Sequence, residues 1–268
     1  LRPTTALIVD HGMQTGSAEV AATAAAQARQ LGCVAAQVIS VAVGTEGGPE
    51  AAARTARYAA LDAARGGAPV LLAHTLDDQA ETVLLGLGRG SGPRSVAGMR
   101  LWDPPWGRPL LEARRADTEA VCAELGLTPW RDPHNTDPRY TRVRLRTEVL
   151  PLLEDVLAGG VAPALARTAA ALREDNDALD ALAAGHLDAL RTADGLTVAG
   201  LEDLPAALRR RVIRGWLLSV GATMLTDVQL RAVDALVGDW HGQGGAAVSS
   251  PLRYQRLIVT RHAGLLTA

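Results

Sequence analysis

Hydrophobic residues in the first half of the chain alternate between short continuous runs and longer segments with helical spacing. The short runs cover residues 6–10, 37–43, 70–73 and 108–111, and each predicts a strand. The longer segments predict helices that begin at Ser17, which we expect to act as the cap, at Pro49 and near Asp77. Since strands and helices alternate, we predict an α/β domain built on a parallel, Rossmann-like sheet.

The pattern changes in the second half of the chain. Residues 131–140 are rich in turn formers and predict a loop, which is followed by a helix over 141–157. After Gly159 and Gly160, helical spacing covers 163–190 and 205–220, and a short β-like segment covers 254–260. We therefore predict a larger domain over residues 1–158 and a smaller, mostly helical domain over residues 159–268.

Composition excludes several classes of protein. With 268 residues, 48% hydrophobic and 21% charged, the chain has enough apolar material for a buried core and is not globally disordered. Cys33 and Cys122 are far apart and predict neither a disulfide framework nor a zinc site. No apolar run approaches the length of a membrane span and no leader opens the chain, so we expect a soluble, cytoplasmic protein.

Basic residues are all arginine, and the formal net charge is −2. Nucleic-acid binding would therefore depend on clustered arginines rather than on overall charge.

Polar residues gather where the run 70–73 ends and the next helix begins. They are His74, Asp77, Asp78, Glu81 and Thr82. Ligands of parallel sheets bind at the carboxyl ends of the strands, so this group is expected to face a site. Carboxylates beside an imidazole could hold Mg²⁺, with Asp78 as the candidate ligand, or move a proton. An acidic helix cap is the alternative, which explains the two aspartates but not His74 or Glu81.

Two further groups could bind an anion or a nucleotide. Arg89 and Gly90 lie where a helix runs into a glycine-rich loop, in which backbone N–H groups and the guanidinium could bind phosphate. A flexible helix exit without a ligand is the alternative interpretation, and it is favoured. Asp10, His11 and Gly12 follow the first predicted strand, again on the ligand side of a parallel sheet.

Arginines cluster in two places. Arg139, Arg142 and Arg146 have the spacing of a basic stripe that could bind phosphate or RNA, whereas a solvated face paired with Glu148 and Glu154 is slightly favoured on spacing alone. A second cluster in the predicted helical domain consists of Arg209, Arg210, Arg211 and Arg214. An RNA-contacting surface is one interpretation, and a solvated helix face is the more usual one.

Several of these motifs occur in one order. Residues 9–12, 50–58, 74–82, 89–92, 108–111 and 135–146 together resemble the tRNA(Ile)-lysidine synthase family of PP-loop ATP pyrophosphatases. The resemblance covers about residues 5–153, and the remainder is more loosely similar to the small helical tRNA-binding domain of that family.

The resemblance implies a ligase that uses ATP and Mg²⁺ to join free lysine to C2 of the wobble cytidine in an isoleucine tRNA with a CAU anticodon. It places His74, Asp77, Asp78, Glu81, Thr82 and Arg142 at the active centre. It places Asp10, His11, Gly12, Arg89 and Gly90 near ATP. Arg139 and Arg146 would contact phosphate or tRNA, and Arg209, Arg210 and Arg214 are assigned to the tRNA body. The oligomeric state stays open, with a homodimer as one option.

One departure from the family concerns the start of the sequence. The SGGxDS phosphate loop that the family carries just upstream of residues 6–10 is not in the sequence given, which begins at Leu1. We expect this loop to be encoded upstream. A non-catalytic RNA-binding module and another PP-loop tRNA-modifying enzyme are the alternatives; tRNA thiolases are disfavoured because Cys33 and Cys122 are isolated.

Overall fold

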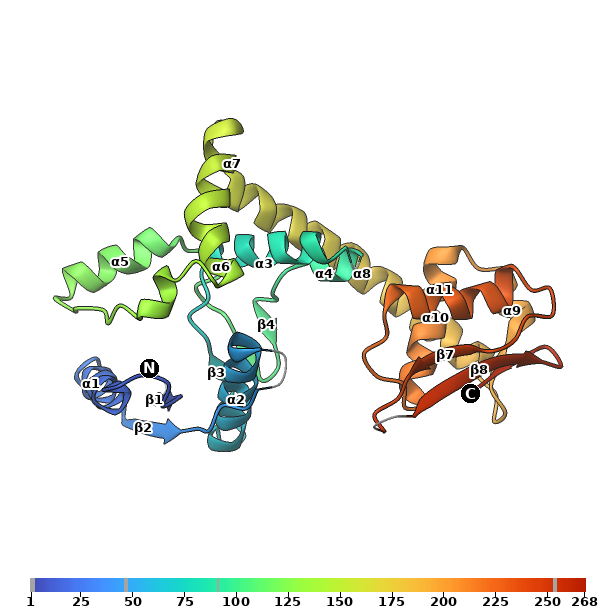
Figure 1. Cartoon of the computed structure of the whole chain (residues 1–268), viewed down its shortest axis with the longest axis horizontal. Helices are drawn as coiled ribbons and strands as arrows, with labels where there is room; N and C mark the ends of the chain where they lie inside the picture. Colours follow the sequence, from blue (N-terminus) through green and yellow to red (C-terminus); the bar gives the residue numbers. More distant parts are fainter. Residues whose placement is uncertain (1–2, 46–47, 91, 253–254) are drawn as a thin grey trace. The chain divides into compact units, whose positions relative to one another are not determined.

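The computed structural model describes residues 3–45, 48–90, 92–252 and 255–268 (Figure 1). The chain forms two compact units. Unit 1 contains residues 1–76 and 100–143, and unit 2 contains residues 77–99 and 144–268. Each unit is therefore assembled from two separate stretches of sequence.

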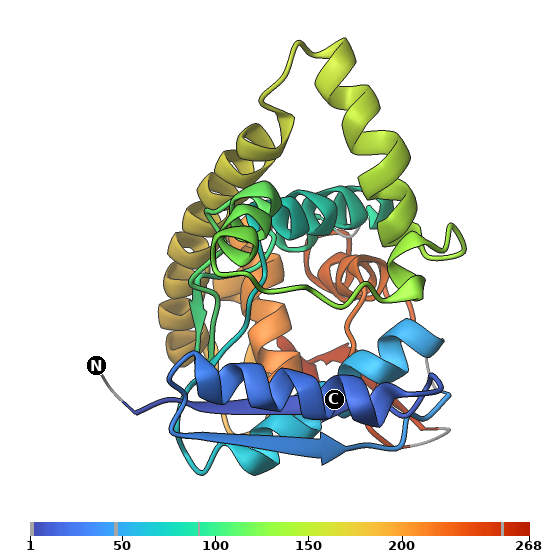
Figure 2. The same ribbon diagram turned by 90° about the vertical axis from the view of Figure 1, so that its left-hand side faces the viewer.

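Unit 1 contains the predicted parallel strands. β1 (Thr5–Asp10) pairs in parallel with β2 (Ala35–Ser40), and α1 (Ser17–Gln30) connects them and lies along the pair in Figure 2. α2 (Pro49–Ala64) leads to β3 (Val70–Leu71), which pairs in parallel with β5 (Trp106–Gly107). The antiparallel β4 (Trp102–Asp103) completes this three-stranded sheet, and α5 (Arg115–Glu124) and a 3₁₀ turn (Pro133–Thr136) follow. The parallel α/β architecture is confirmed.

Two local predictions for unit 1 are wrong. Residues 108–111 form turns, not a strand, because Leu111 N–H bonds to the Arg108 carbonyl and Ala113 N–H to that of Leu110. The strand lies one step earlier, at Trp106–Gly107. Ser17 is the first helical residue of α1 rather than its cap, because Gly16 with a positive φ of 83° precedes it.

The first part of unit 2 is helical. α3 (Leu76–Arg89) and the short α4 (Pro93–Val96) are followed, after unit 1 resumes, by the segment α6 (Thr141–Arg144), a π-helical turn (Leu145–Val149) and α7 (Leu150–Val156). The long α8 (Val161–Leu190) begins after the glycine pair predicted as a boundary. Glu154 caps α8 by accepting hydrogen bonds from the backbone N–H groups of Val161 and Ala162. This role differs from the arginine pairing considered for Glu154.

The C-terminal part of unit 2 contains more β-structure than the sequence predicts. α9 (Val198–Glu202), α10 (Ala206–Ser219) and α11 (Asp227–Gly238) accompany an antiparallel sheet of order β6-β9-β8-β7. Its strands are β6 (Leu196–Thr197), β7 (Ala246–Ser249), β8 (Arg256–His262) and β9 (Leu265–Thr267). Leu196, Leu201, Val212, Ile213, Trp216, Leu217 and Leu266 are among the buried residues of the core between helices and sheet. These side chains remove a large apolar area from water, which stabilises this part of the chain.

Within the described residues, no single helix is both long and apolar enough to cross a membrane. The segments Thr141–Val156 and Val161–Leu190 meet the length and composition criteria only as a pair, and they are bent by 94° at their junction.

Candidate functional site

The end of β1 forms a tight turn that shapes one side of a pocket. Gly12 has φ +62°, a conformation that favours glycine, and its N–H donates to Asp10 Oδ1 at 2.9 Å. This backbone hydrogen bond, together with a hydrogen bond from the Ser17 side chain, holds the pKa of Asp10 below its ordinary value. Asp10 is therefore an anion whose side chain organises the turn.

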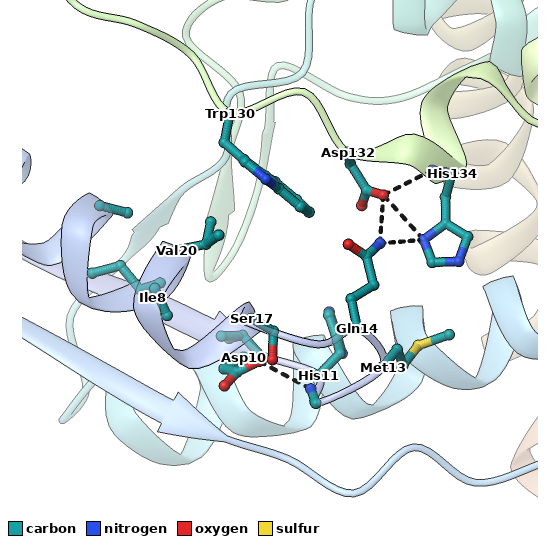
Figure 3. A pocket seen from close by; sticks show the side chains of 14 residues that line it. Ile8, Asp10, His11, Met13, Gln14, Ser17, Val20, Trp130, Asp132 and His134 are labelled. Carbon is teal, nitrogen blue, oxygen red and sulfur yellow. Dashed lines mark hydrogen bonds and ion pairs between the residues drawn. The ribbon is translucent and has the colours of Figure 1, made fainter.

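A pocket of about 270 Å³ lies beside this turn, entirely within unit 1 (Figure 3). One wall is apolar and comes from β1 and α1, including Ile8 and Val20, and Trp130 extends toward it from the other side. The polar wall is a hydrogen-bonded group. The Gln14 amide donates to Asp132 Oδ1 at 2.7 Å and lies 2.7 Å from His134 Nδ1. A pocket with one apolar wall and one polar wall suits a nucleobase.

His11 and Arg57 each bring a buried nitrogen atom close to this turn. His11 Nδ1 and Arg57 Nε are both buried, and no partner for either is found in the part of the chain that the structure describes. Burial first, and then the charge of Arg57, lower the pKa of His11. Burial is the largest cause that lowers the pKa of Arg57, and the charges of Arg54 and Arg142 lower it further. Tyr58 acts in the opposite direction. A buried cation in such surroundings favours an anionic ligand.

Sequence reasoning about individual sites missed Arg57. The only available signal was its place in the 50–58 motif that contributed to the family resemblance. The burial of Arg57 is what points to an anionic ligand. That burial depends on the packing of α2, which residue spacing does not predict.

The start of α3 carries a buried ion pair. Glu81 is 0% exposed, and Arg146 Nε lies 2.7 Å from its Oε1. Nη2 of the same arginine lies 3.6 Å from Asp78 Oδ1. Burial alone would lower the pKa of Arg146, but the hydrogen bond to Glu81 and the charges of Glu81, Asp78 and Asp77 raise it. The structure thus brings Asp78, Glu81 and Arg146 together across 65 residues of sequence.

The other residues predicted at this site have different surroundings. Thr82 Oγ1 donates to the Asp78 carbonyl at 2.8 Å within α3. His74 lies in unit 1, on the segment between β3 and α3, while Asp77, Asp78, Glu81 and Thr82 lie in unit 2. Gln79, which no sequence motif singles out, is buried and bonds to both the N–H and the carbonyl of Met99.

The glycine-rich exit of α3 is partly a packing feature. Arg89 is the last residue of α3, and Gly90 has φ +61° with its N–H bonded to the Leu87 carbonyl. Gly86, inside the helix, lies so close to α4 that an added Cβ would be 1.8 Å from the Ser95 carbonyl oxygen. Residue 91, part of the predicted loop, lies outside the described residues.

The predicted stripe of Arg139, Arg142 and Arg146 resolves into three separate ion pairs. Arg139 pairs with Asp137 at 2.6 Å before α6 begins, which raises the pKa of Arg139 and lowers that of Asp137. Arg142 lies 3.3 Å from Glu50 of α2. The π-helical turn after Arg144 also interrupts the spacing on which a stripe depends.

The arginines of α10 are not a uniform solvated face either. Arg209 Nε lies 2.6 Å from Asp234 of α11, and Arg210 lies 3.6 Å from the same carboxylate. Arg211 pairs with Asp180 of α8 at 3.0 Å. Two of the three arginines assigned to tRNA, Arg209 and Arg210, therefore share an acidic partner.

Oxygen donors suited to Mg²⁺ are present at the start of α3. Within the described ranges, no group of three or more His, Cys, Asp or Glu side chains is positioned to hold a metal ion. Mg²⁺ in nucleotide sites usually needs only one or two carboxylates, because phosphates and water supply its other ligands. Asp77 and Asp78 fit that requirement.

Comparison with known proteins defines the class of protein. The PP-loop domain family matches residues 1–153, and the TilS substrate binding domain matches residues 196–262. A solved structure of a U34-tRNA thiolase from Methanococcus maripaludis is similar with a TM-score of 0.53 and 17% identity, covering 64% of this chain and 63% of the thiolase. The chain is thus a PP-loop protein with an additional substrate binding domain.

Curated relatives define the family more closely. The chain is 69% identical to tRNA(Ile)-lysidine synthase of Mycolicibacterium paratuberculosis, over all of this chain and 83% of that protein. It is 67% identical to the Mycobacterium tuberculosis protein of the same name, over 99% of this chain and 83% of that protein. Identity to the Rhodococcus erythropolis enzyme is 59%, over 97% and 80%. The chain belongs to the tRNA(Ile)-lysidine synthase family, as its motifs predict.

Proposed function

We propose that this protein ligates lysine to C2 of the wobble cytidine of an isoleucine tRNA at the expense of ATP, forming lysidine. The observation that carries this function is the 59–69% identity to tRNA(Ile)-lysidine synthases over almost the whole chain. The PP-loop domain supports the use of ATP, and the TilS domain supports a tRNA substrate.

The reaction has two steps in this proposal. The cytidine C2 oxygen first attacks the α-phosphate of ATP and displaces pyrophosphate, so the base becomes adenylated. The lysine ε-amine then attacks C2 and loses a proton. The new C2–N bond replaces the C2–O bond, and AMP leaves with that oxygen. Asp77 or Asp78 would hold Mg²⁺, and the ion would supply charge neutralisation for the first step.

We assign the nucleotide end of the site to unit 1. The turn of Asp10, His11 and Gly12 shapes the pocket, and Arg57 is a buried cation suited to phosphate. Arg142, held beside Glu50, is a further phosphate contact of unit 1 in this proposal. For Arg89 and Gly90, which lie at the end of α3 in unit 2, contact with ATP stays a separate proposal.

We assign the start of α3 to the lysine half of the reaction. A carboxylate of Asp77 or Asp78 can attract the lysine ammonium and accept its proton. Glu81 is fully buried against Arg146, so we assign it to positioning: it fixes the guanidinium beside Asp78. Thr82 steadies the helix turn through the Asp78 carbonyl, and His74 organises the approach from β3.

The remaining assignments concern tRNA and organisation. Arg139, Arg210 and Arg214 are proposed tRNA contacts, whereas Arg209 is committed to Asp234. We propose a catalytic domain over residues 1–158 and a recognition domain over residues 159–268. The protein acts on free lysine in the cytoplasm in this proposal, and a homodimer is the oligomeric state to test.

The experiment is incorporation of labelled lysine into an isoleucine tRNA transcript by the complete gene product, with ATP and Mg²⁺. We expect D78A to lower the rate at least about 100-fold, because the carboxylate acts at the reacting groups. D62A, which removes an exposed aspartate of α2, is the matched control and should stay within about twofold. Omitting ATP should abolish incorporation.

Three results would contradict the proposal. Lysine incorporation without ATP would exclude the adenylated base. tRNA binding without any incorporation would favour a non-catalytic RNA-binding module. Equal rates for D78A and D62A would remove Asp78 from the active site while leaving the family function intact.

A further inference from the structure

Two arginines share one carboxylate, and a third arginine lies within range of its charge, where α4, α8 and α10 meet in unit 2. Asp180 of α8 accepts a hydrogen bond from Arg94 of α4 and another from Arg211 Nε at 3.0 Å, both on Oδ1. Arg214 lies one helical turn after Arg211 and also senses the charges of Arg94 and Asp180. Among these four side chains, three positive charges meet one negative charge, which leaves an excess of two positive charges.

Arg214 is the member of this cluster with no partner. It is half-buried, and within the residues that the structure describes it has neither an ion pair nor a hydrogen bond. Burial, followed by the charge of Arg94, lowers the pKa of Arg214 in spite of Asp180. A desolvated guanidinium next to a second one is unfavourable unless an anion is added.

A buried amide lies on the inner side of the same cluster. Asn176 of α8 is 4% exposed, and its Oδ1 accepts from Arg211 Nη2 at 2.6 Å. That contact fixes the orientation of the amide, so its other terminal atom is the donor Nδ2. Nδ2 is buried and has no hydrogen-bond partner in the described chain. Buried donors without an acceptor are rare and point to a missing ligand or water.

We propose that this cluster, which we call the Asp180 arginine cluster, binds a phosphate group. Arg94 and Arg214 would contact the phosphate oxygens, since the planar guanidinium matches phosphate geometry. Arg211 and Asp180 hold the cluster in place, and the side chain of Arg94 is 41% exposed, so the site is reachable from solvent.

The ligand we infer is a backbone phosphate of the tRNA. This choice rests on the proposed function and on the position of Arg211 and Arg214 within the matched TilS substrate binding domain. Free phosphate or pyrophosphate has the same chemistry, and the experiment separates the two sources.

The test is the affinity of the complete gene product for an isoleucine tRNA transcript, measured by fluorescence anisotropy at several salt concentrations. For the double variant R94Q/R214Q we expect Kd to rise about 10-fold and the slope of log K against log salt to fall by about 1–2, because one or two phosphate contacts are lost. R231Q is the matched control; it removes an exposed arginine of α11 that pairs with Asp227, and it should leave both quantities unchanged. R94K/R214K should keep most of the salt slope because it keeps the charge.

Each outcome decides the proposal. Unchanged tRNA affinity and salt slope in R94Q/R214Q, with thermal unfolding like that of the wild type, would overturn it. A variant that unfolds is replaced by the two single substitutions, read in the same assay. Weaker binding of pyrophosphate by calorimetry with unchanged tRNA binding would assign the site to free phosphate and overturn the RNA ligand. If the wild type binds tRNA but incorporates no lysine, the proposed reaction fails while the binding test still stands.

Discussion

Two parts of unit 2 combine arginine and carboxylate in opposite proportions. At the start of α3, Asp77, Asp78 and Glu81 surround one arginine, Arg146. In the Asp180 arginine cluster, three arginines surround one carboxylate. Carboxylates outnumber the arginine among the side chains of the first group, and carboxylates suit an ammonium or a metal ion. Arginines outnumber the carboxylate among those of the second group, and guanidinium groups suit phosphate.

The pair of Arg209 and Asp234 shows what a structural arrangement looks like. Its Nε–Oδ1 distance of 2.6 Å is as short as that of the Arg146–Glu81 contact, and both side chains are mostly buried. Arg209 also donates to the Leu204 carbonyl, and the pair lies beside the apolar core of the C-terminal part. Proximity of opposite charges alone therefore does not mark a site, because a buried pair of this kind can serve only to support the core.

The largest expected effect comes from removing Arg146 from the acidic group. R146A takes away the guanidinium that lies 2.7 Å from Oε1 of the fully buried Glu81, and we expect a loss of about 4 kcal/mol in the free energy of unfolding, measured in urea. R144A is the matched control, since Arg144 forms an exposed pair with Glu148, and it should cost less than about 1 kcal/mol. Similar costs for the two variants would show that burial does not distinguish these pairs.

Breaking the structural pair should come next in size. D234A leaves Arg209 buried without a partner and is expected to cost about 3 kcal/mol in the free energy of unfolding. tRNA affinity at a temperature where the variant is folded should not fall, because Arg210, the proposed tRNA contact that lies 3.6 Å from Asp234, keeps its charge. The double variant R209M/D234L should recover most of the stability because it removes both charges. Lysine incorporation impaired in that double variant would give the pair a functional role.

The sequence predicts these charged groups only in part. Strand and helix periodicity correctly places β1, α1, α2, α3, α8 and α10 to within a few residues, because each has an apolar face with regular spacing. The short strands β6 and β9 escape prediction because runs of two or three residues carry no detectable period, and they pair only through contacts distant in sequence. The antiparallel sheet of unit 2 is therefore not predicted.

The same limit applies to the sites. The acidic residues at the start of α3 are close together in sequence, so the sequence identifies them. Their partner Arg146 is predicted only as a member of the arginine stripe, and its contact with Glu81 is not predicted. The Asp180 arginine cluster combines residues from 94 to 214, and neither Arg94 nor Asp180 is part of a motif that the sequence singles out. Which carboxylate an arginine pairs with depends on how the helices pack. The spacing of charges along one helix does not reveal that packing.

Two glycines of α3 test whether α3 positions α4, which carries Arg94. G86A would place a Cβ 1.8 Å from the Ser95 carbonyl oxygen, so we expect α4 to shift and the protein to lose about 2 kcal/mol of unfolding free energy. Gly88 in the same helix has no neighbouring atom within 4 Å of the position that a Cβ would take, and G88A should gain about 0.5–1 kcal/mol from helix propensity. Denaturation curves of the two variants give the comparison, and equal stability would show that the α3–α4 contact is not tight.

The smallest effect concerns His11 in unit 1, an uncompensated group of a different kind. Burial and Arg57 lower the pKa of His11 below its ordinary value. The unfolded chain then binds more protons than the folded chain in the pH range below the ordinary histidine pKa of about 6.5. The stability contribution is present above that pH and is lost as the pH falls through the lower folded pKa.

We therefore expect the wild type to lose slightly more stability than H11Q between pH 7.5 and pH 5, by less than about 1 kcal/mol because solvent screens a partly exposed ring. Denaturation of both proteins at the two pH values measures the difference, and other titrating groups cancel in the comparison. R57Q should reduce the difference without abolishing it, since burial is the larger cause of the shift. A wild type that gains stability relative to H11Q on acidification would mean that an anion, not Arg57, faces the imidazole.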